Sequence, residues 1–377
     1  MGSKSVPEVR FKGFSGEWDE CKIVDVLNIN SGRDYKHLKK GDIPVYGTGG
    51  YMHSVNDKLS NDDAIGIGRK GTINKPQLLL APFWTVDTLF YMTVKGENDL
   101  YFLYSLANRI DWKKYDESTG VPSLSKNSIY KISINVPLLR EQTRIGNFFK
   151  QLDETITIQQ QELDTLKQTK QGFLQKMFPK EGESLPEIRF PGFSGEWEKS
   201  KLNDIGIVEM CKRIFKNQTT VVGDIPFYKI GTFGRKADSF ISRELFEEYK
   251  SKYPFPEVGD ILISASGTIG RTVVYNGEDA YYQDSNIVWL KPNKDRVKNC
   301  FLQQFYQIVK WHGTEGSTIK RLYNSKIRET EIYLPSINEQ ELIGRFFNRL
   351  DNTIFIHEQE LETLLETKKA FLQKMFV

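Results

Sequence analysis

The chain has 377 residues, of which 39% are hydrophobic and 27% charged, and its formal net charge is +3. This length suggests two or three domains, and the mild positive charge permits a polyanionic partner without requiring one. The 3 scattered cysteines and 4 separated histidines give no disulfide framework or metal-ligand spacing, and neither a signal-peptide pattern nor a long apolar run occurs. We therefore expect a cytoplasmic protein without a metal site.

A repeated motif marks the start of each half of the chain. Residues 7–18 read Pro-Glu-Val-Arg-Phe-Lys-Gly-Phe-Ser-Gly-Glu-Trp, and residues 186–197 repeat this string with two substitutions, 179 positions later. Together with a helix pattern that also occurs twice, this repetition predicts an internal duplication. Each half is then a domain of about 120–140 residues followed by a long helix.

The domains are predicted to be α+β. Short β-branched segments bounded by Gly, Pro, Asn and Asp indicate short strands joined by loops. Recurrent segments of this kind are residues 41–46 and 223–228, 65–73 and 261–269, and 124–129 and 322–327. Helical patterns lie near residues 100–108 and 298–309, and the second half carries about 19 extra residues. Since the halves differ mainly in their loops, we expect two binding modules of one fold with different targets.

A basic stretch precedes a loop rich in tyrosine and small residues in each half. Such a mixture suits a DNA backbone and base edges, although each stretch alone could be an ordinary solvated surface. Its recurrence in both halves favours binding. The DNA-binding candidates are Arg33, Lys36, Lys39, Tyr46 and Thr48 in the first half, and Lys212, Arg213, Lys229, Thr232, Arg235 and Lys236 in the second.

Residues 66–71 match the G-x-G-x-x-G pattern of dinucleotide-binding proteins. That pattern needs a helix at its third glycine, but Thr-Ile-Asn-Lys-Pro follows here, and the second half keeps only Gly267. A nucleotide cofactor is therefore disfavoured, while a solvated surface turn stays possible. We prefer a tight turn that contacts DNA, since glycine allows close approach to phosphates and arginine can read guanine. The candidates are Arg69 and Lys70, then Ser264, Ser266 and Arg271.

A third recurrent loop is rich in hydroxyl groups. Its DNA-binding candidates are Ser118, Thr119 and Ser123 in the first half, and Lys320 and Arg321 in the second. Asp87 and Asp284 also recur, and we expect them to be structural turn or cap residues. Since the sequence shows no methyltransferase signature, Walker loop or nuclease carboxylate cluster, we expect no catalysis by this chain.

Each half ends in a helix whose mostly apolar seam follows a heptad spacing. The predicted seam residues are Leu152, Ile156, Gln159, Leu163, Leu166, Lys170, Phe173 and Met177, and, 198 positions later, Leu350, Ile354, His357, Leu361, Leu364, Lys368, Phe371 and Met375. A parallel pair would bury Lys170 against Lys368, whereas an antiparallel pair places Gln159 opposite Lys368. We therefore predict an antiparallel coiled coil within one chain, with a seam roughly 37 Å long.

The helix starts permit two interpretations. Each contains a Glu-Gln pair, Glu141 with Gln142 and Glu339 with Gln340, followed by isoleucine and two phenylalanines. These residues could be buried beneath the attached domain or could form a docking face for another protein. Short linkers place each domain against the end of one helix and the start of the other, which again favours the antiparallel pair.

The ordered set of motifs, present twice, resembles the specificity subunit of type I restriction–modification enzymes. The resemblance rests on the opening motif, the Gly-Asp-Ile-Pro-x-Tyr strings, the Gly-Thr-Ile turns and the Pro-x-x-x-Glu-Gln helices. It implies two target recognition domains that each read half of a bipartite double-stranded DNA sequence. It also implies methyltransferase subunits, likewise two, docked on the helices, and restriction or translocase subunits in the full complex. S-adenosylmethionine, ATP and Mg²⁺ would belong to those partners, which would carry adenine methylation and cleavage.

The expected architecture is thus α+β, with two pseudo-two-fold-related target recognition domains separated by an antiparallel coiled coil. The expected boundaries are residues 1–137 and 181–335 for the domains, and 138–180 and 336–377 for the spacer helices. Alternatives are a duplicated scaffold or adhesion protein that binds protein or carbohydrate, a nucleotide-using enzyme, and a coiled-coil homodimer. Salt-dependent retention on DNA would distinguish the first of these from the preferred function.

Overall fold

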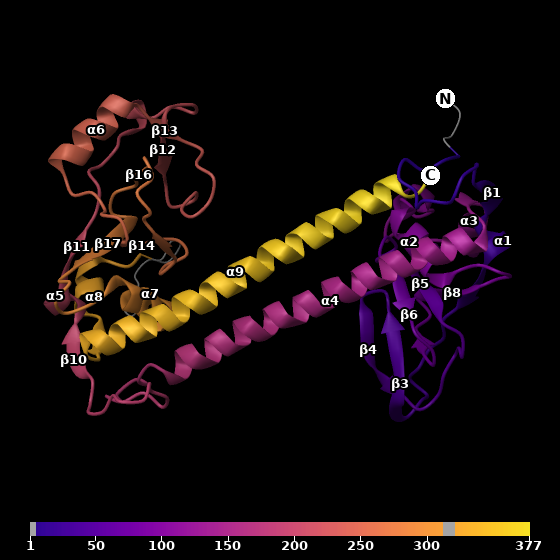
Figure 1. Ribbon diagram of the computed structural model, residues 1–377, viewed down its shortest axis with the longest axis horizontal. Helices are drawn as coiled ribbons and strands as arrows, with labels where there is room; N and C mark the ends of the chain where they lie inside the picture. Colours follow the sequence, from indigo (N-terminus) through magenta and orange to yellow (C-terminus); the bar gives the residue numbers. More distant parts are fainter. Residues whose placement is uncertain (1–4, 312–320) are drawn as a thin grey trace. The chain divides into compact units, whose positions relative to one another are not determined.

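The computed structural model describes residues 5–311 and 321–377. The chain forms two compact units, one built from residues up to 162 and from 357 onward, the other from residues 163–356 (Figure 1). Each unit contains a mixed α and β domain and a part of each long helix. Among the described residues, no helix is long and apolar enough to span a membrane.

The first unit contains three small sheets. Its elements before the long helix are β1 (Asp19–Lys22), α1 (Ile23–Val26), β2 (Leu27–Ser31), β3 (Lys40–Gly47), β4 (Gly50–Val55), β5 (Ala64–Gly68), β6 (Gln77–Leu79), β7 (Trp84–Thr85), β8 (Leu89–Val94), α2 (Leu100–Arg109), the 3₁₀ helix η1 (Trp112–Tyr115), α3 (Lys126–Tyr130) and β9 (Ser133–Val136). β1 pairs with β9, the order β2-β8-β5-β6 makes a four-stranded antiparallel sheet, and β4-β3-β7 makes a three-stranded one. β5 is buried at every residue, as the centre of a core requires.

The second unit repeats the same three sheets. Its elements are β10 (Glu198–Lys201), α5 (Leu202–Ile205), β11 (Gly206–Glu209), η2 (Lys216–Gln218), β12 (Ile225–Tyr228), β13 (Phe240–Ile241), α6 (Arg243–Lys252), β14 (Ile261–Ser264), β15 (Thr272–Val274), β16 (Tyr281–Tyr282), β17 (Ile287–Pro292), α7 (Asn299–Ile308), α8 (Asn324–Glu329) and β18 (Glu331–Leu334). Its sheets are β10-β18, β11-β17-β14-β15 and β13-β12-β16. The matching strand orders agree with the predicted duplication. α6 has no counterpart among the described residues of the first unit.

One recurrent segment differs from its prediction. Residues 124–129 and 322–327 were expected to be strands, but most of each segment belongs to α3 or α8. The side chain of Ser125 accepts a hydrogen bond from the amide of Ser128 at 3.0 Å, so it caps the start of α3. α8 has no such side-chain cap. Each segment contains a single β-branched residue, Ile129 or Ile327, so its composition does not favour a strand. The predicted helices near residues 100–108 and 298–309 are confirmed as α2 and α7.

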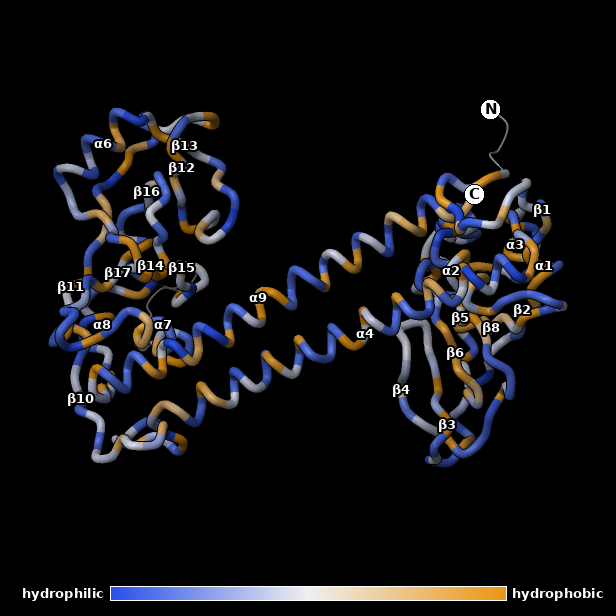
Figure 2. Tube along the Cα trace, viewed as in Figure 1, coloured by the Kyte–Doolittle hydropathy of each residue, from blue (hydrophilic) through white to orange (hydrophobic). Residues whose placement is uncertain are grey.

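The long helices α4 (Leu139–Lys176) and α9 (Ile337–Lys374) pack as an antiparallel coiled coil. In the first unit the rings of Phe148 and Phe371 lie 5.0 Å apart, and in the second those of Phe173 and Phe346 lie 5.1 Å apart. The start of each helix therefore packs on the end of the other. Apolar residues recur among polar ones along both helices (Figure 2). The predicted seam positions are buried or half-buried, whereas most positions between them are exposed.

The predicted register of this pair is wrong by one heptad. The side-chain oxygen Oε1 of Gln159 accepts a hydrogen bond from Nδ1 of His357 at 2.9 Å, although Gln159 was expected to face Lys368. Lys368 instead pairs with Asp153, and Lys170 with Asp351, each at 2.5 Å. The reason is that the seam continues by one more heptad at the N-terminal end of each helix, through phenylalanines that the predicted seam did not include. The longer seam has its midpoint nearer the N-terminal end of each helix. The residues of α4 and α9 that face each other therefore differ by one heptad from the predicted pairs.

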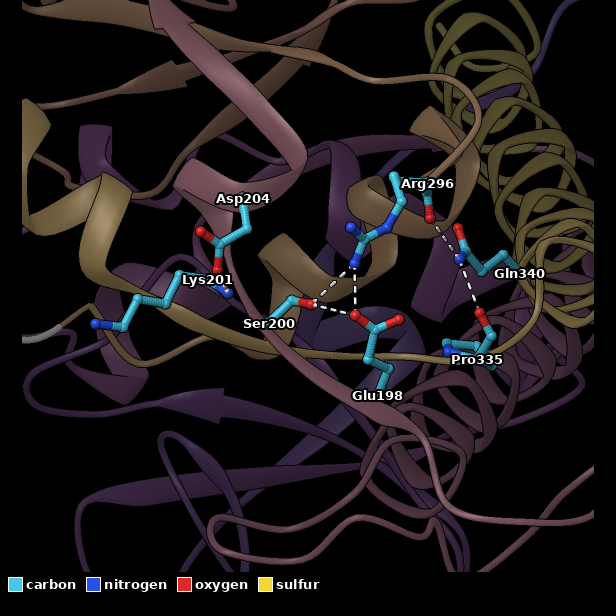
Figure 3. A network of polar contacts seen from close by, with 7 residues as sticks. All are labelled: Glu198, Ser200, Lys201, Asp204, Arg296, Pro335 and Gln340. Atoms are coloured by element: carbon cyan, nitrogen blue, oxygen red, sulfur yellow. Dashed lines mark hydrogen bonds and ion pairs between the residues drawn. The ribbon is translucent and has the colours of Figure 1, made fainter.

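The Glu-Gln pairs at the helix starts are buried beneath their own domains, which excludes them as a docking face. Gln340 donates to the carbonyl oxygens of Pro335 at 2.9 Å and Arg296 at 3.1 Å, beside the ion pair of Arg296 with Glu198 (Figure 3). Gln142 donates in the same way to Pro137 at 2.9 Å. Ile145, Phe149, Ile343 and Phe347 are at most 2% exposed. These residues lock each helix start to a domain.

The opening motif connects both helices within each unit. In the first unit Arg10 makes two 2.7 Å hydrogen bonds to the buried carboxylate of Glu141 in α4, and Val9 donates to the carbonyl of Lys374 in α9. In the second unit Arg189 pairs with Glu339 at 2.6 Å, and Ile188 donates to Lys176. The motif therefore recurs because each copy holds one helix start and one helix end.

Candidate nucleic-acid interface

Three loops that are distant in sequence meet in the first domain. The glycine-rich turn after β5 pairs with the hydroxyl-rich loop through a bridge between Lys70 and Ser123. Gly71 donates to Pro122 at 2.8 Å and Leu124 donates to Arg69 at 2.9 Å. The amide of Arg69 also donates at 2.8 Å to the carbonyl of Thr88, in the turn between β7 and β8. We call this set of three loops the loop cluster of the domain.

The hydroxyl-rich loop is held by a residue that the sequence did not single out. One carboxylate oxygen of Asp116 accepts hydrogen bonds from the amide of Ser123 at 2.9 Å and from the amide and hydroxyl of Ser118 at 3.0 and 2.8 Å. These bonds, the one from the Ser123 amide first, lower the pKa of Asp116 below its ordinary value. The loop is therefore fixed before any ligand binds. Thr119 remains exposed at its tip.

The basic stretch and the β3–β4 loop reach the same cluster. Arg33 is exposed, and its amide donates to Thr85 at 2.9 Å, at the end of β7. Tyr46 accepts from the amide of Val86 at 3.0 Å, and Gln77 donates to the carbonyl of Thr48 at 3.2 Å. All three predicted regions of this domain thus converge. Lys36 and Lys39 lie further along the stretch and line a separate hollow of about 490 Å³ beside β3 and β4.

The second domain builds the same cluster from different side chains. Leu322 donates to Ala265 at 2.8 Å, and Ala265 donates at 2.7 Å to Asn286, in the turn between β16 and β17. Ser266 and Arg321 form the bridge that corresponds to Lys70 and Ser123. The predicted candidate Lys320 and most of its loop lie outside the described residues.

Other candidates of the second domain are positioned by specific partners. Arg213 is exposed and donates through Nε to Asp284 at 2.8 Å, so Asp284 holds a candidate side chain besides shaping its turn. Lys212 lies over the ring of Tyr253 at 4.9 Å. The amine of Lys229 is paired with Asp238 at 2.8 Å.

The loop after β12 also joins this cluster. Thr232 accepts from the amide of Lys229, and Arg271 donates to the carbonyl of Phe233 at 3.0 Å. Gln283 connects the loop to the turn after β16, since its side chain accepts from Ile230 at 3.0 Å and its amide donates to Tyr228 at 2.9 Å. Arg235 and Lys236 are exposed on this loop.

Two predicted hydroxyl candidates are poorly placed to contact a ligand. Ser264 is 1% exposed and its oxygen donates to Thr268, within its own turn. Ser266 is 5% exposed and donates to Asn286 at 2.9 Å. Both therefore support the turn, which corrects the expectation for these two residues. Sequence reasoning missed Asn286 because its role depends on loops that meet only in the fold.

The glycines of the G-x-G-x-x-G pattern have a structural explanation. Gly66 and Gly68 lie in the buried strand β5, and a Cβ atom on Gly68 would stand 2.0 Å from the carbonyl oxygen of Thr72. Gly71 has a φ of +94°, which favours glycine. The segment continues into β6 rather than a helix, so the geometry of a dinucleotide site is missing here.

Two domains of one fold, each with a convergent set of cation-bearing loops, define a nucleic-acid recognition protein. The sequence matches the family model described as the type I restriction modification DNA specificity domain over residues 15–168 and 194–366. The chain belongs to this family. The resemblance seen in its motifs is therefore confirmed, and a scaffold or adhesion protein is not favoured.

Individual relatives agree with this assignment. The chain is 36% identical to the putative type I restriction enzyme specificity subunit S.HindORF215P of Haemophilus influenzae, over 91% of this chain and 90% of that protein. It is 25% identical to the MjaVIII specificity subunit of Methanocaldococcus jannaschii, over 83% and 75%. The fold is similar to the crystal structure of the S subunit from M. genitalium, with a TM-score of 0.72, 15% identity and 99% of each chain covered. A chain from a structure of the type I R-M system gives a TM-score of 0.53 at 17% identity, covering 95% and 97%.

Proposed function

We propose that this chain selects the DNA target of a type I restriction–modification complex, with each domain reading one half of an asymmetric, bipartite duplex sequence. The observation that carries the proposal is the loop cluster, which both domains build with the same backbone pairing but with different side chains. A shared frame with unlike side chains is what two readers of different half-sites require. Exposed cations stand around both clusters, as a polyanionic ligand demands.

The two clusters carry different chemistry. In the first domain the exposed cations at the cluster are Arg33, Arg69 and Lys70, while the exposed Lys36 and Lys39 line the separate hollow. In the second they are Lys212, Arg213, Arg235 and Lys236, with Arg271 and Arg321 half-buried. Two readers that differ in this way would recognise unlike half-sites, so the target is asymmetric rather than palindromic.

The paired helices set the distance between the half-sites and bind the modification subunits. Apolar side chains off the seam are exposed on both helices, with Ile158 at 56%, Phe355 at 61% and Ile356 at 55%. Ile158 also lines a hollow of about 450 Å³ with Leu78 and Tyr101. This hollow gathers apolar side chains into one surface, and contiguous exposed apolar surfaces are typical of protein-binding sites.

Catalysis would then be carried out by the partner subunits of the complex. Two modification subunits would use S-adenosylmethionine to methylate adenine, and restriction or translocase subunits would use ATP and Mg²⁺. We propose no cofactor and no catalytic residue for this chain, and we expect the complex to act in the cytoplasm.

The test is DNA retention by the full chain with its modification subunits. In electrophoretic mobility shifts, the logarithm of the DNA-binding constant should fall linearly with the logarithm of the salt concentration. Ile158→Glu should weaken capture of the modification subunits, whereas Gln151→Glu, an exposed change on the same helix, should leave it intact. Absence of DNA binding in the complete complex would refute the proposal.

A further inference from the structure

The bridge inside each loop cluster contains one cation, but the two domains place it on opposite sides. In the first domain the glycine-rich turn supplies Lys70 and the hydroxyl-rich loop supplies Ser123. In the second domain the turn supplies Ser266 and the loop supplies Arg321. The pair is therefore one cation and one serine in both domains, with the two residues exchanged.

The geometry of the bridge allows either of its two residues to place a cation at nearly the same position. The hydrogen bonds lie on either side of the pair, from Gly71 to Pro122 and from Leu124 to Arg69, so Lys70 and Ser123 form a non-hydrogen-bonded antiparallel pair. Residues so paired have Cα atoms about 4.5 Å apart and side chains on the same face. Leu322 donates to Ala265 in the same way in the second domain. A long cationic side chain can thus reach the same place from either side.

The cation is also presented rather than neutralised. Lys70 is exposed, and no atom beyond the adjacent residues lies within 4 Å of the point where a Cβ on Gly71 would stand. Arg321 is held by the amide oxygen of Asn286 at 3.1 Å, which also accepts from Ser266. No carboxylate within the described residues forms an ion pair with either cation. Neither cation is therefore neutralised by a described carboxylate, and Lys70 is exposed while Arg321 is half-buried.

The neighbouring residue behaves differently. Arg69 in the turn corresponds to Ala265, so its charge is present in one domain alone. Its guanidinium lies 5.8 Å from the ring centre of Phe90. A side chain present in one domain alone, such as Arg69, fits a role in reading bases, which differ between half-sites. A charge present in both domains fits contact with the phosphate backbone, which every duplex has.

We propose that Lys70 and Arg321 are equivalent phosphate contacts, which position each domain on the DNA backbone without reading sequence. This inference rests on the proposed function. Removing a phosphate contact weakens binding about equally on all sequences. Each removal also lowers the slope of log affinity against log salt by about one.

The experiment measures fluorescence anisotropy of the full chain, with its modification subunits, on two unrelated duplexes of about 30 base pairs at several salt concentrations. Lys70→Ser and Arg321→Ser should each lower the salt slope by about one, with equal loss on both duplexes. Lys70→Ser combined with Ser123→Arg, which copies the second domain's arrangement, should restore both slope and affinity. Arg321→Lys should keep the slope, and Lys131→Ser, an exposed lysine after α3, serves as the control.

Different outcomes would overturn the phosphate assignment and the proposed function. An unchanged slope in Lys70→Ser, a loss confined to one duplex, or no rescue by the exchanged pair would overturn the phosphate assignment. Wild-type protein without salt-dependent DNA binding would instead overturn the proposed function itself.

Discussion

Replacing Arg10 by alanine should destabilise the first unit strongly. The side chain of Glu141 is 3% exposed and that of Arg10 14%, and the guanidinium makes two 2.7 Å hydrogen bonds to the carboxylate. Arg10→Ala would leave a buried carboxylate without its cation, which costs about 3–5 kcal/mol. For units of roughly 150–250 residues this corresponds to a fall in Tm of about 6–20 °C.

The assay is thermal unfolding followed by circular dichroism, with hydrogen exchange to locate the loosened segment. Lys12→Ala, an exposed change on the same segment, should alter stability by less than about 0.5 kcal/mol. Arg10→Met combined with Glu141→Leu removes both charges and should recover most of the stability. A single variant as stable as the wild type, or a double variant as unstable as the single, would refute the reasoning.

Three further predictions concern a loop, the thiols and the helices. Because hydrogen bonds lower the pKa of Asp116, the stability they give its loop is fully present above the ordinary value of 3.8 and is lost as pH falls through the lowered pKa. The protection factor of the Ser123 amide, which compares its exchange rate with that of an unstructured amide at the same pH, should therefore fall in acid, and already at neutral pH in Asp116→Asn. Burial raises the pKa of Cys211 to about 12 and that of Cys21 to about 11, so iodoacetamide at pH 8 should alkylate both slowly in the native protein and rapidly after unfolding, as mass spectrometry would show. Inserting one heptad into both long helices should lengthen the unread gap of the methylated motif by about three base pairs, since seven residues add about 10 Å, and should leave both half-sites unchanged; altered half-sites would contradict this.

Repetition made much of the fold predictable. The duplicated seam and opening motif were sufficient to predict two domains and a pair of antiparallel helices, because period and spacing can be read directly from a sequence. The register was not, since Phe148 and Phe346 belong to the seam as well as to the domain cores. A residue that serves two packing partners cannot be assigned to one of them from spacing alone.

The candidate site was predicted by composition but not by arrangement. Recurrent basic and glycine-rich loops marked Arg69 and Lys70, yet their bridge to the loop before α3 joins residues more than fifty positions apart. Asp116 and Asn286 carried no signal, because accepting hydrogen bonds from loop amides becomes a role only after folding. Ser264 was misassigned for the converse reason, since a hydroxyl suited to DNA also suits a buried turn.

The central claim is that this chain holds two unlike DNA readers, and methylome sequencing tests it most directly. Cells carrying the subunit with matching modification subunits should show methylated adenines in one asymmetric motif made of two half-sites and an unread gap. Substituting Arg69, the exposed arginine found only in the first loop cluster, should change one half-site only. A continuous or palindromic motif, or changes in both half-sites at once, would contradict the account.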